Sequence, residues 1–205
     1  MAKQLLIEVR DGFAKVILNR PQARNALTPP LMAELASALK SLEENDGVSV
    51  IFLMGAGLDF CAGIDLKYVR SALGKEDAES LAALIPCGAA VADLIEGLKK
   101  PVIAAVHGRA VAGGLILAEF CDLILADESA VFADAHAKWG FIPGWQEPQR
   151  IARSIGLRRA RQIFLTCDPV SAVEAKEMGL VWKLVPSGTL DAAVEELGRK
   201  YKNMN

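Results

Sequence analysis

A glycine-rich corner near the middle of the chain constrains the fold most strongly. The apolar run 102–106 leads through glycines into a second apolar run, which predicts a strand that turns sharply into a helix. Gly113 and Gly114 fall at the expected start of that helix, where main-chain N–H groups lack partners within the helix. Two glycines let a ligand approach the main chain closely, and the helix dipole adds partial positive charge. The corner is therefore either a binding site for an oxyanion or phosphate, or a tight turn that needs glycine only for its shape.

Short apolar runs and amphipathic segments alternate along the rest of the chain. We expect strands at 5–9, 13–18, 48–54, 102–106, 123–126, 130–132 and 181–185. We expect further helices at 28–44, 81–98, 148–155, 157–164, 171–178 and 189–202. Residues 66–80 carry mixed charge and are expected to be helical or loop-like and the most mobile part. Because parallel neighbours need crossover connections, this alternation predicts an α/β fold with largely parallel pairing.

Composition narrows the class of protein. The 205 residues suffice for one domain with a substantial core, and the net charge of −2 disfavours binding to nucleic acid or to an anionic membrane. The four cysteines form no C-x-x-C pair, which disfavours a zinc site or a disulfide framework and indicates a reducing compartment. The first residues lack the apolar core of a signal peptide, and no stretch is expected to reach a charge-free transmembrane length. We therefore expect a cytoplasmic protein.

Several motifs, in order and at characteristic separations, resemble the crotonase, or enoyl-CoA hydratase/isomerase, superfamily over nearly the whole chain. They are Asn19-Arg20-Pro21 with Asn25-Ala26-Leu27, Gly55-Ala56-Gly57 with Phe60 to Leu66, Lys100-Pro101 to Gly108, Ala112-Gly113-Gly114 with Cys121-Asp122, Gly140 to Gly144, and Gly179-Leu180-Val181. The resemblance implies an α/β spiral of repeated ββα units. It implies a core at 1–188 that binds an acyl-CoA thioester, and a C-terminal helix at 189–205 as a shortened trimerisation region. It also implies a homotrimer or a dimer of trimers, with coenzyme A as part of the substrate and no further cofactor or metal.

The resemblance assigns binding roles to two of these motifs. Superfamily members grip the thioester carbonyl with two main-chain N–H groups, which correspond here to Ile64 and Gly113. Such donors stabilise the negative charge that develops on the carbonyl oxygen, and one donor is worth about 3–4 kcal/mol. The expected contacts of the coenzyme A and acyl portions are Ala62, Gly63, Asp65, Leu66, Gly114 and Ile116, with Arg24 on a phosphate, although an arginine in a loop can equally be merely solvated. Trp139 and Trp145 either line an acyl pocket, which favours a ring-bearing or bulky acyl group, or belong to the core.

The chain departs from the superfamily at the catalytic glutamates. Hydratases of the superfamily use two of them, and counting along the motifs places the first at Ile116 and the second at His136. Isoleucine carries no proton, so the two-glutamate addition of water cannot be carried over. Histidine can take and return a proton near neutral pH, and Asp134 is a candidate to orient it. The alternative is a histidine that only fills space and bonds to a neighbour.

Other polar residues receive weaker assignments. Glu147 is a second candidate acid, since it lies where other superfamily members place an acidic catalytic group. Glu119 and Asp122 are expected to cap or pack, and His107 to be structural.

The sequence therefore predicts an acyl-CoA-processing enzyme of isomerase or hydratase type in fatty acid metabolism. His136 is its acid–base group. A CoA-thioester hydrolase or decarboxylase is one alternative, because the superfamily runs both reactions on the same oxyanion-stabilising site. An acyl-CoA-binding protein without catalysis is the other.

Overall fold

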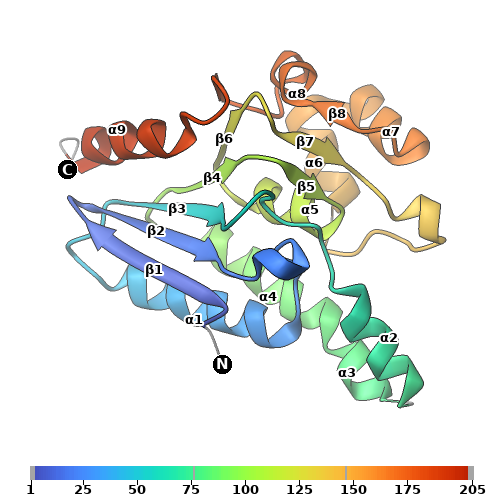
Figure 1. Ribbon diagram of the computed structural model, residues 1–205. Coiled ribbons are helices and arrows are strands. Elements are labelled where there is room, and N and C mark those ends of the chain that lie inside the picture. Colours follow the sequence, from blue (N-terminus) through green and yellow to red (C-terminus); the bar gives the residue numbers. More distant parts are fainter. Residues whose placement is uncertain (1–2, 76, 146, 203–205) are drawn as a thin grey trace.

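A six-stranded sheet runs through the centre of the molecule (Figure 1). The computed structural model describes residues 3–75, 77–145 and 147–202. The strands of this sheet follow the order β1 (Leu5–Arg10), β2 (Phe13–Leu18), β3 (Val50–Gly55), β4 (Val102–Val106), β6 (Leu123–Asp127) and β9 (Lys183–Val185). The β1–β2 pair is antiparallel, and every later neighbour is parallel. The strands expected at 5–9 and 13–18, which form this antiparallel pair, and the largely parallel α/β architecture are thus confirmed.

A smaller sheet lies beside the first and contains β5 (Arg109–Val111), β7 (Val131–Ala133) and β8 (Val170–Ser171). An isolated bridge between Cys61 and Ala110 extends it to the segment that follows β3. The chain therefore visits the large sheet and then the small one in successive turns, as β3 with residue 61, β4 with β5, and β6 with β7. This is the repeated unit expected of the spiral. The sequence did not indicate β5 and β8, because Arg109-Ala110-Val111 and Val170-Ser171 form no continuous apolar run.

The large sheet separates two apolar clusters, because successive side chains of a strand point to opposite faces. Phe52 of β3 and Ile103 of β4 point to one face, where α9 (Leu190–Lys202) covers them with Val194 and Leu197. The opposite face packs against the remaining core, to which α1 (Pro29–Glu43), α4 (Leu84–Gly97) and α5 (Gly113–Phe120) contribute. Figure 1 shows α9 on one side of the sheet and α1 and α4 on the other. The division of the chain at residue 188 stays a prediction.

Local sequence signals account for the helix boundaries. Thr28 accepts a hydrogen bond from the Leu31 N–H at the start of α1, and prolines occupy its first turn. Ser171 and Glu174 form a reciprocal capping box at the start of α8 (Ala172–Met178). Gly179 ends the same helix with a φ of 90°, a conformation that glycine adopts without strain. Two further helices, α6 (Glu147–Ile155) and α7 (Leu157–Thr166), precede α8 in the chain.

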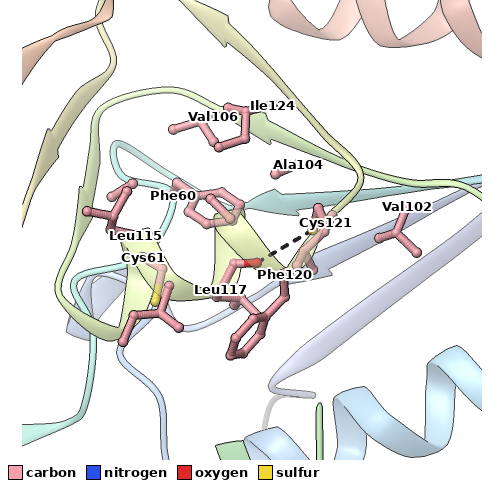
Figure 2. Close-up of a cluster of buried hydrophobic side chains, with 14 of the residues drawn as sticks. Phe60, Cys61, Val102, Ala104, Val106, Leu115, Leu117, Phe120, Cys121 and Ile124 are labelled. Carbon is pink, nitrogen blue, oxygen red and sulfur yellow. Dashed lines mark hydrogen bonds between the residues drawn. The ribbon is translucent and has the colours of Figure 1, made fainter. Parts of the chain in front are cut away.

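The helix after the glycine corner is buried almost all round. Figure 2 shows Leu115, Leu117 and Phe120 of α5 in one cluster with side chains of β4, β6 and residues 60–61. Leu115 is fully buried and Leu117 is 2% exposed. This packing fixes the first turn of α5 relative to the loop that follows β3.

The segment between β3 and β4 agrees with the expected helical or loop-like character and differs in where its last helix begins. Residues 66–80 contain α2 (Leu66–Gly74) and the start of α3 (Ala78–Ala82), and α4 begins at Leu84 rather than near residue 81. Ala78–Gly97 is long and apolar enough to cross a membrane by length and composition alone, but it carries Glu79, Asp93 and Glu96 and so is not the charge-free stretch that the sequence was expected to lack. Within it, Val91 and Ile95 of α4 belong to the core.

Candidate active site

An apolar pocket with a volume of about 380 Å³ lies where the glycine corner, the loop after β3 and α4 meet. Its lining is Ala62, Ile64, Leu66, Val69, Leu84, Ile85, Val111, Ala112, Gly113, Ile116, Ala135, His136, Trp139, Phe141, Ile142, Gly144 and Trp145. Apart from the His136 ring and the two indoles, these side chains have no polar atoms. The pocket therefore suits an apolar group that presents its polar atoms to the main chain.

The main chain at residues 63–64 lies directly against the start of α5. A Cβ atom placed on Gly63 would lie 3.1 Å from the Gly113 nitrogen, and one placed on Gly113 would lie 3.5 Å from the Ile64 nitrogen. Within the part of the chain that the structure describes, neither the Ile64 N–H nor the Gly113 N–H donates to a protein acceptor. Two neighbouring main-chain donors at an apolar pocket can bind an oxygen that carries negative charge.

Glycine is required on both sides of this contact. Gly63 has a φ of +89°, and a Cβ there would lie 2.8 Å from the Val111 oxygen. A Cβ on Gly114 would lie 2.1 Å from the Cys61 oxygen, a main-chain atom that cannot move without shifting the loop. Side chains at these positions would push the two segments apart. Gly63 and Gly114 thus support the pocket without lining it.

Buried polar groups hold the loop that carries Ile64. The side-chain amide of Asn25 donates to the Ala56 and Asp59 oxygens at 2.9 and 2.7 Å. The Cys61 thiol donates to the Asn25 oxygen at 3.2 Å, and burial raises its pKa to about 12, so it stays protonated. These bonds satisfy groups that would otherwise be buried without partners, and they fix the loop against residues 20–27.

Arg20 and Asp65 join the same two segments by an ion pair of 2.8 Å. Asp65 also accepts hydrogen bonds from the Lys67 and Tyr68 N–H groups and so caps α2. Burial raises the pKa of Asp65, but the bonds from Arg20 and from the helix lower it by more, so the net direction is down. The Asp65 carboxylate is thus committed to structure within the protein, and its predicted role in substrate binding remains a prediction.

Arg24 lies outside the pocket, with its guanidinium largely exposed and 3.8 Å from Asp59. Its main-chain oxygen accepts a hydrogen bond from Ala62, a pocket residue, at 2.9 Å. The exposed charge therefore lies on a segment tied to the pocket wall.

His136 and Asp134 lie together at the opposite wall. Nδ1 of His136 is 2.5 Å from Oδ1 of Asp134, and the His136 N–H donates to Oδ2 at 3.0 Å. Asp134 is almost fully buried, and the Cys167 thiol lies 3.8 Å from its Oδ2. Burial raises the pKa of Asp134, but the bonds and charge of His136 lower it by more, so the carboxyl is held ionised. The expected contact between Asp134 and His136 is present, although β7 ends at Ala133 and the two residues follow it in a turn.

One main-chain bond brings this dyad to the glycine corner. The Ala112 N–H, which precedes α5, donates to the Ala133 oxygen at the end of β7 at 2.9 Å. Ala112 has a φ of 47°, a conformation that residues other than glycine seldom adopt and that the surrounding structure must hold. The segment bearing His136 is therefore fixed beside the two main-chain donors.

Of the residues predicted for the site, the pocket brings together Ala62, Ile64, Leu66, Gly113, Ile116, His136, Trp139 and Trp145. The Ile116 side chain is 1% exposed, and it offers the pocket no proton. Trp139 is 64% exposed at the mouth. The side chain of Glu147 lies outside what the structure describes, so its predicted role stays a prediction; its main chain begins α6.

Polar residues set aside as structural do bond within the fold. Asp122 accepts from the Val102 N–H at 2.7 Å, and Glu119 accepts from the Ser154 hydroxyl at 3.1 Å. His107 lies 2.9 Å from the Gly57 oxygen. Among residues 3–75, 77–145 and 147–202, no group of three or more His, Cys, Asp or Glu side chains could hold a metal ion.

The sequence did not indicate that the helices after β3 line the pocket. Val69 of α2 and Leu84 and Ile85 of α4 line the pocket, as do Phe141 and Ile142. The apolar pattern of α4 predicted a core helix, but nothing local indicates which of its residues face a cavity. Phe141 and Ile142 were part of a quoted motif, and their exposure gave no sequence signal.

Comparisons with known proteins agree with this architecture. The family model described as enoyl-CoA hydratase/isomerase matches residues 8–204. "Enoyl-CoA hydratase, mitochondrial" of Pongo abelii is 43% identical over 84% of this chain and 58% of its own length. "Probable enoyl-CoA hydratase 1, peroxisomal" of Arabidopsis thaliana is 36% identical over 89% of this chain and 68% of its own length.

Solved structures give the same result. The crystal structure of enoyl-CoA hydratase from Bacillus anthracis superposes with a TM-score of 0.89 at 34% identity, covering 97% of this chain and 76% of that one. The structure of enoyl-CoA hydratase from Mycobacterium tuberculosis H37Rv gives a TM-score of 0.83 at 36% identity, covering 99% and 84%. The chain therefore has the crotonase fold and belongs to the enoyl-CoA hydratase/isomerase family.

Proposed function

We propose that the pocket binds the acyl end of an acyl-CoA thioester and that the Ile64 and Gly113 N–H groups bind its carbonyl oxygen. The observation that carries the proposal is the juxtaposition of these two main-chain segments at an apolar pocket, where a Cβ placed on Gly113 would lie 3.5 Å from the Ile64 nitrogen. Removing a proton next to a thioester carbonyl produces an enolate, whose charge gathers on the oxygen. Two fixed donors stabilise that charge without reorganising.

In this proposal His136 transfers the proton. Its ring lines the pocket, and the ionised Asp134 bonded to Nδ1 holds the ring's orientation. The carboxylate also stabilises the imidazolium that forms when the ring takes a proton. Asp134 is thus a positioning residue, and His136 is the acid–base group.

Double-bond isomerisation suits this arrangement best, because one group can take a proton from one carbon and return it to another. Hydration needs a second group to hold the water, and the position expected for it carries Ile116. A second candidate is thioester hydrolysis, which the Asp134–His136 pair favours, since a carboxylate-oriented histidine can activate a water molecule. Decarboxylation and acyl-CoA binding without catalysis remain alternatives.

The coenzyme A portion lies, in this proposal, along residues 62–66 and reaches Arg24 with a phosphate. The exposed guanidinium and the Ala62 to Arg24 main-chain bond support this path. We further propose a homotrimer or a dimer of trimers, no cofactor, since coenzyme A is part of the substrate, and a cytoplasmic location consistent with four unpaired cysteines.

A panel of CoA esters tests the proposal. The protein is incubated with 2-enoyl-, 3-enoyl-, 3-hydroxyacyl-, malonyl- and saturated acyl-CoA, and the products are followed by mass spectrometry. We expect turnover of an enoyl ester that is lost in His136→Ala and kept in Glu147→Ala. Release of free CoA from a saturated ester would instead identify the hydrolase, and tight binding with no turnover of any ester would overturn catalysis altogether.

A further inference from the structure

We propose that the indole of Trp145, seated in a notch at Gly88 of α4, is the wall that limits the length of the acyl group. This inference deepens the proposed function and rests on it. Trp145 lines the pocket and is 7% exposed, so its ring occupies space between α4 and α5 that an acyl chain would otherwise enter.

Gly88 and Trp145 fit each other. A Cβ on Gly88 would lie 1.9 to 2.3 Å from Cε2, Nε1 and Cζ2 of Trp145, so the ring lies directly over the helix main chain. Glycine within a helix destabilises it relative to alanine, and this contact explains why the residue is tolerated in α4. The notch is a position where only glycine admits the indole.

The ring reaches from this notch to the proposed oxyanion site. Its Cζ3 atom would lie 3.2 Å from a Cβ on Gly113, at the first residue of α5. An acyl chain whose carbonyl oxygen is held at Gly113 therefore starts beside the indole and cannot pass between the two helices. The ring forms a wall close to the reacting carbons.

Several contacts keep the indole in this orientation. Nε1 donates to the Ile85 oxygen at 3.1 Å. The Phe120 ring packs against the indole with 6.4 Å between ring centroids. The Arg150 guanidinium in turn lies over the Phe120 ring, 5.0 Å from its centroid. The main chain of Trp145 has a φ of +56°, which a bulky residue adopts only when its surroundings hold it there. The wall is therefore fixed rather than free to swing aside.

Chain-length dependence of binding tests the inference. Straight-chain saturated acyl-CoA esters from acetyl to dodecanoyl, with free CoA as reference, are titrated by calorimetry, so that the readout needs no turnover. Each methylene that enters an apolar pocket strengthens binding about four-fold, and the gain stops when the chain meets a wall. We expect a plateau in the wild type, a plateau several carbons longer in Trp145→Leu, and a shorter one in Gly88→Ala, whose new methyl group pushes the ring into the pocket.

Trp182→Leu is the matched control, since Trp182 is 41% exposed and lies outside the pocket, and its plateau should equal that of the wild type. Circular dichroism and thermal melting check that each variant folds. If Trp145→Leu does not fold, Trp145→Phe decides in its place, because the smaller ring keeps most of the packing and should still lengthen the plateau. Identical plateaus in the wild type and the folded variants would overturn the inference, whereas acyl esters that bind no better than free CoA would overturn the proposed function itself.

Discussion

The two walls of the pocket are built on different principles. The wall formed by residues 59–66 and the start of α5 presents main-chain atoms, and hydrogen bonds from Asn25, Cys61 and Arg20 fix it. The wall formed by residues 134–145 presents side chains, chiefly His136 and two indoles. The first wall carries Ile64 and Gly113, whose N–H groups are proposed to bind the thioester oxygen. The second carries His136, which is proposed to transfer the proton.

This difference separates two tasks. Polarising a carbonyl requires only donors at fixed positions, which main-chain N–H groups supply whatever side chains they bear. Transferring a proton and selecting an acyl group depend on side chains, which a few substitutions can change. We infer that the fold supplies the first task and the 134–145 segment the second.

Gly114→Ala tests the main-chain wall and should have the largest effect. The new methyl group would lie 2.1 Å from the Cys61 oxygen and must displace the loop that carries Ile64. We expect kcat/KM to fall about 100- to 1000-fold, as when an oxyanion donor is lost. Steady-state kinetics on the best ester of the panel measures it. Gly97→Ala, where a Cβ meets nothing within 4 Å, is the control and should keep wild-type activity.

The side-chain wall is tested by His136→Ala, for which we expect a loss of about 100-fold in kcat with little change in KM. Asp134→Asn should lower kcat about ten-fold, since His136 remains but loses the ionised carboxylate that orients its ring. The pH profile of kcat should shift in Asp134→Asn, which a merely structural role would not produce. Unchanged kcat in folded His136→Ala would remove this residue from the mechanism.

Glu119 tests whether the acid at the far end of α5 is outside the chemistry. Burial raises its pKa to about 7 from a usual 4.5, and the Ser154 bond and Arg150 charge offset only part of this. Between pH 4.5 and pH 7, Glu119 is ionised in the unfolded chain but still protonated in the folded protein. The free energy of unfolding therefore falls as pH rises through this range, by about 3 kcal/mol in all. Urea denaturation of Glu119→Gln at pH 4.5 and pH 8 should show that most of this fall has gone. Its kcat should equal that of the wild type, and a large loss would place Glu119 in the mechanism.

Arg24→Ala should have the smallest effect. A contact between an exposed guanidinium and a phosphate is weak and is screened by salt. Its loss should therefore raise KM only about three-fold at low ionic strength and leave kcat unchanged. The difference should vanish with an acyl-pantetheine substrate that lacks phosphate. A difference that persists with acyl-pantetheine would show that Arg24 acts on the loop and not on the phosphate.

The sequence predicted most of the framework. Short, nearly continuous apolar runs placed β2, β3 and β4, and Thr28 and Ser171 marked the starts of α1 and α8. Through the family resemblance it also predicted that Ile64, Gly113 and His136 share one site, and all three line the pocket. These features are local in sequence, or are carried by motifs whose spacing is read directly.

The rest depends on contacts between distant segments. The notch of Gly88 under Trp145 joins residues 57 positions apart, and neither residue alone indicates the other. Gly63 and Gly114 were predicted to touch substrate, whereas their visible role is to let two main chains approach, which only three-dimensional packing reveals. The short strands β5 and β8 exist because the spiral pairs them, so no window of sequence predicts them.

Vibrational spectroscopy of a bound ester tests the central claim most directly. An acyl-CoA labelled with carbon-13 at the thioester carbonyl is bound to the wild type, to His136→Ala and to Gly114→Ala, and the carbonyl stretch is compared with that of the free ester. The Ile64 and Gly113 donors predict a shift to lower frequency that persists in His136→Ala and is lost in Gly114→Ala. A carbonyl frequency in the wild-type complex equal to that of the free ester would contradict the account.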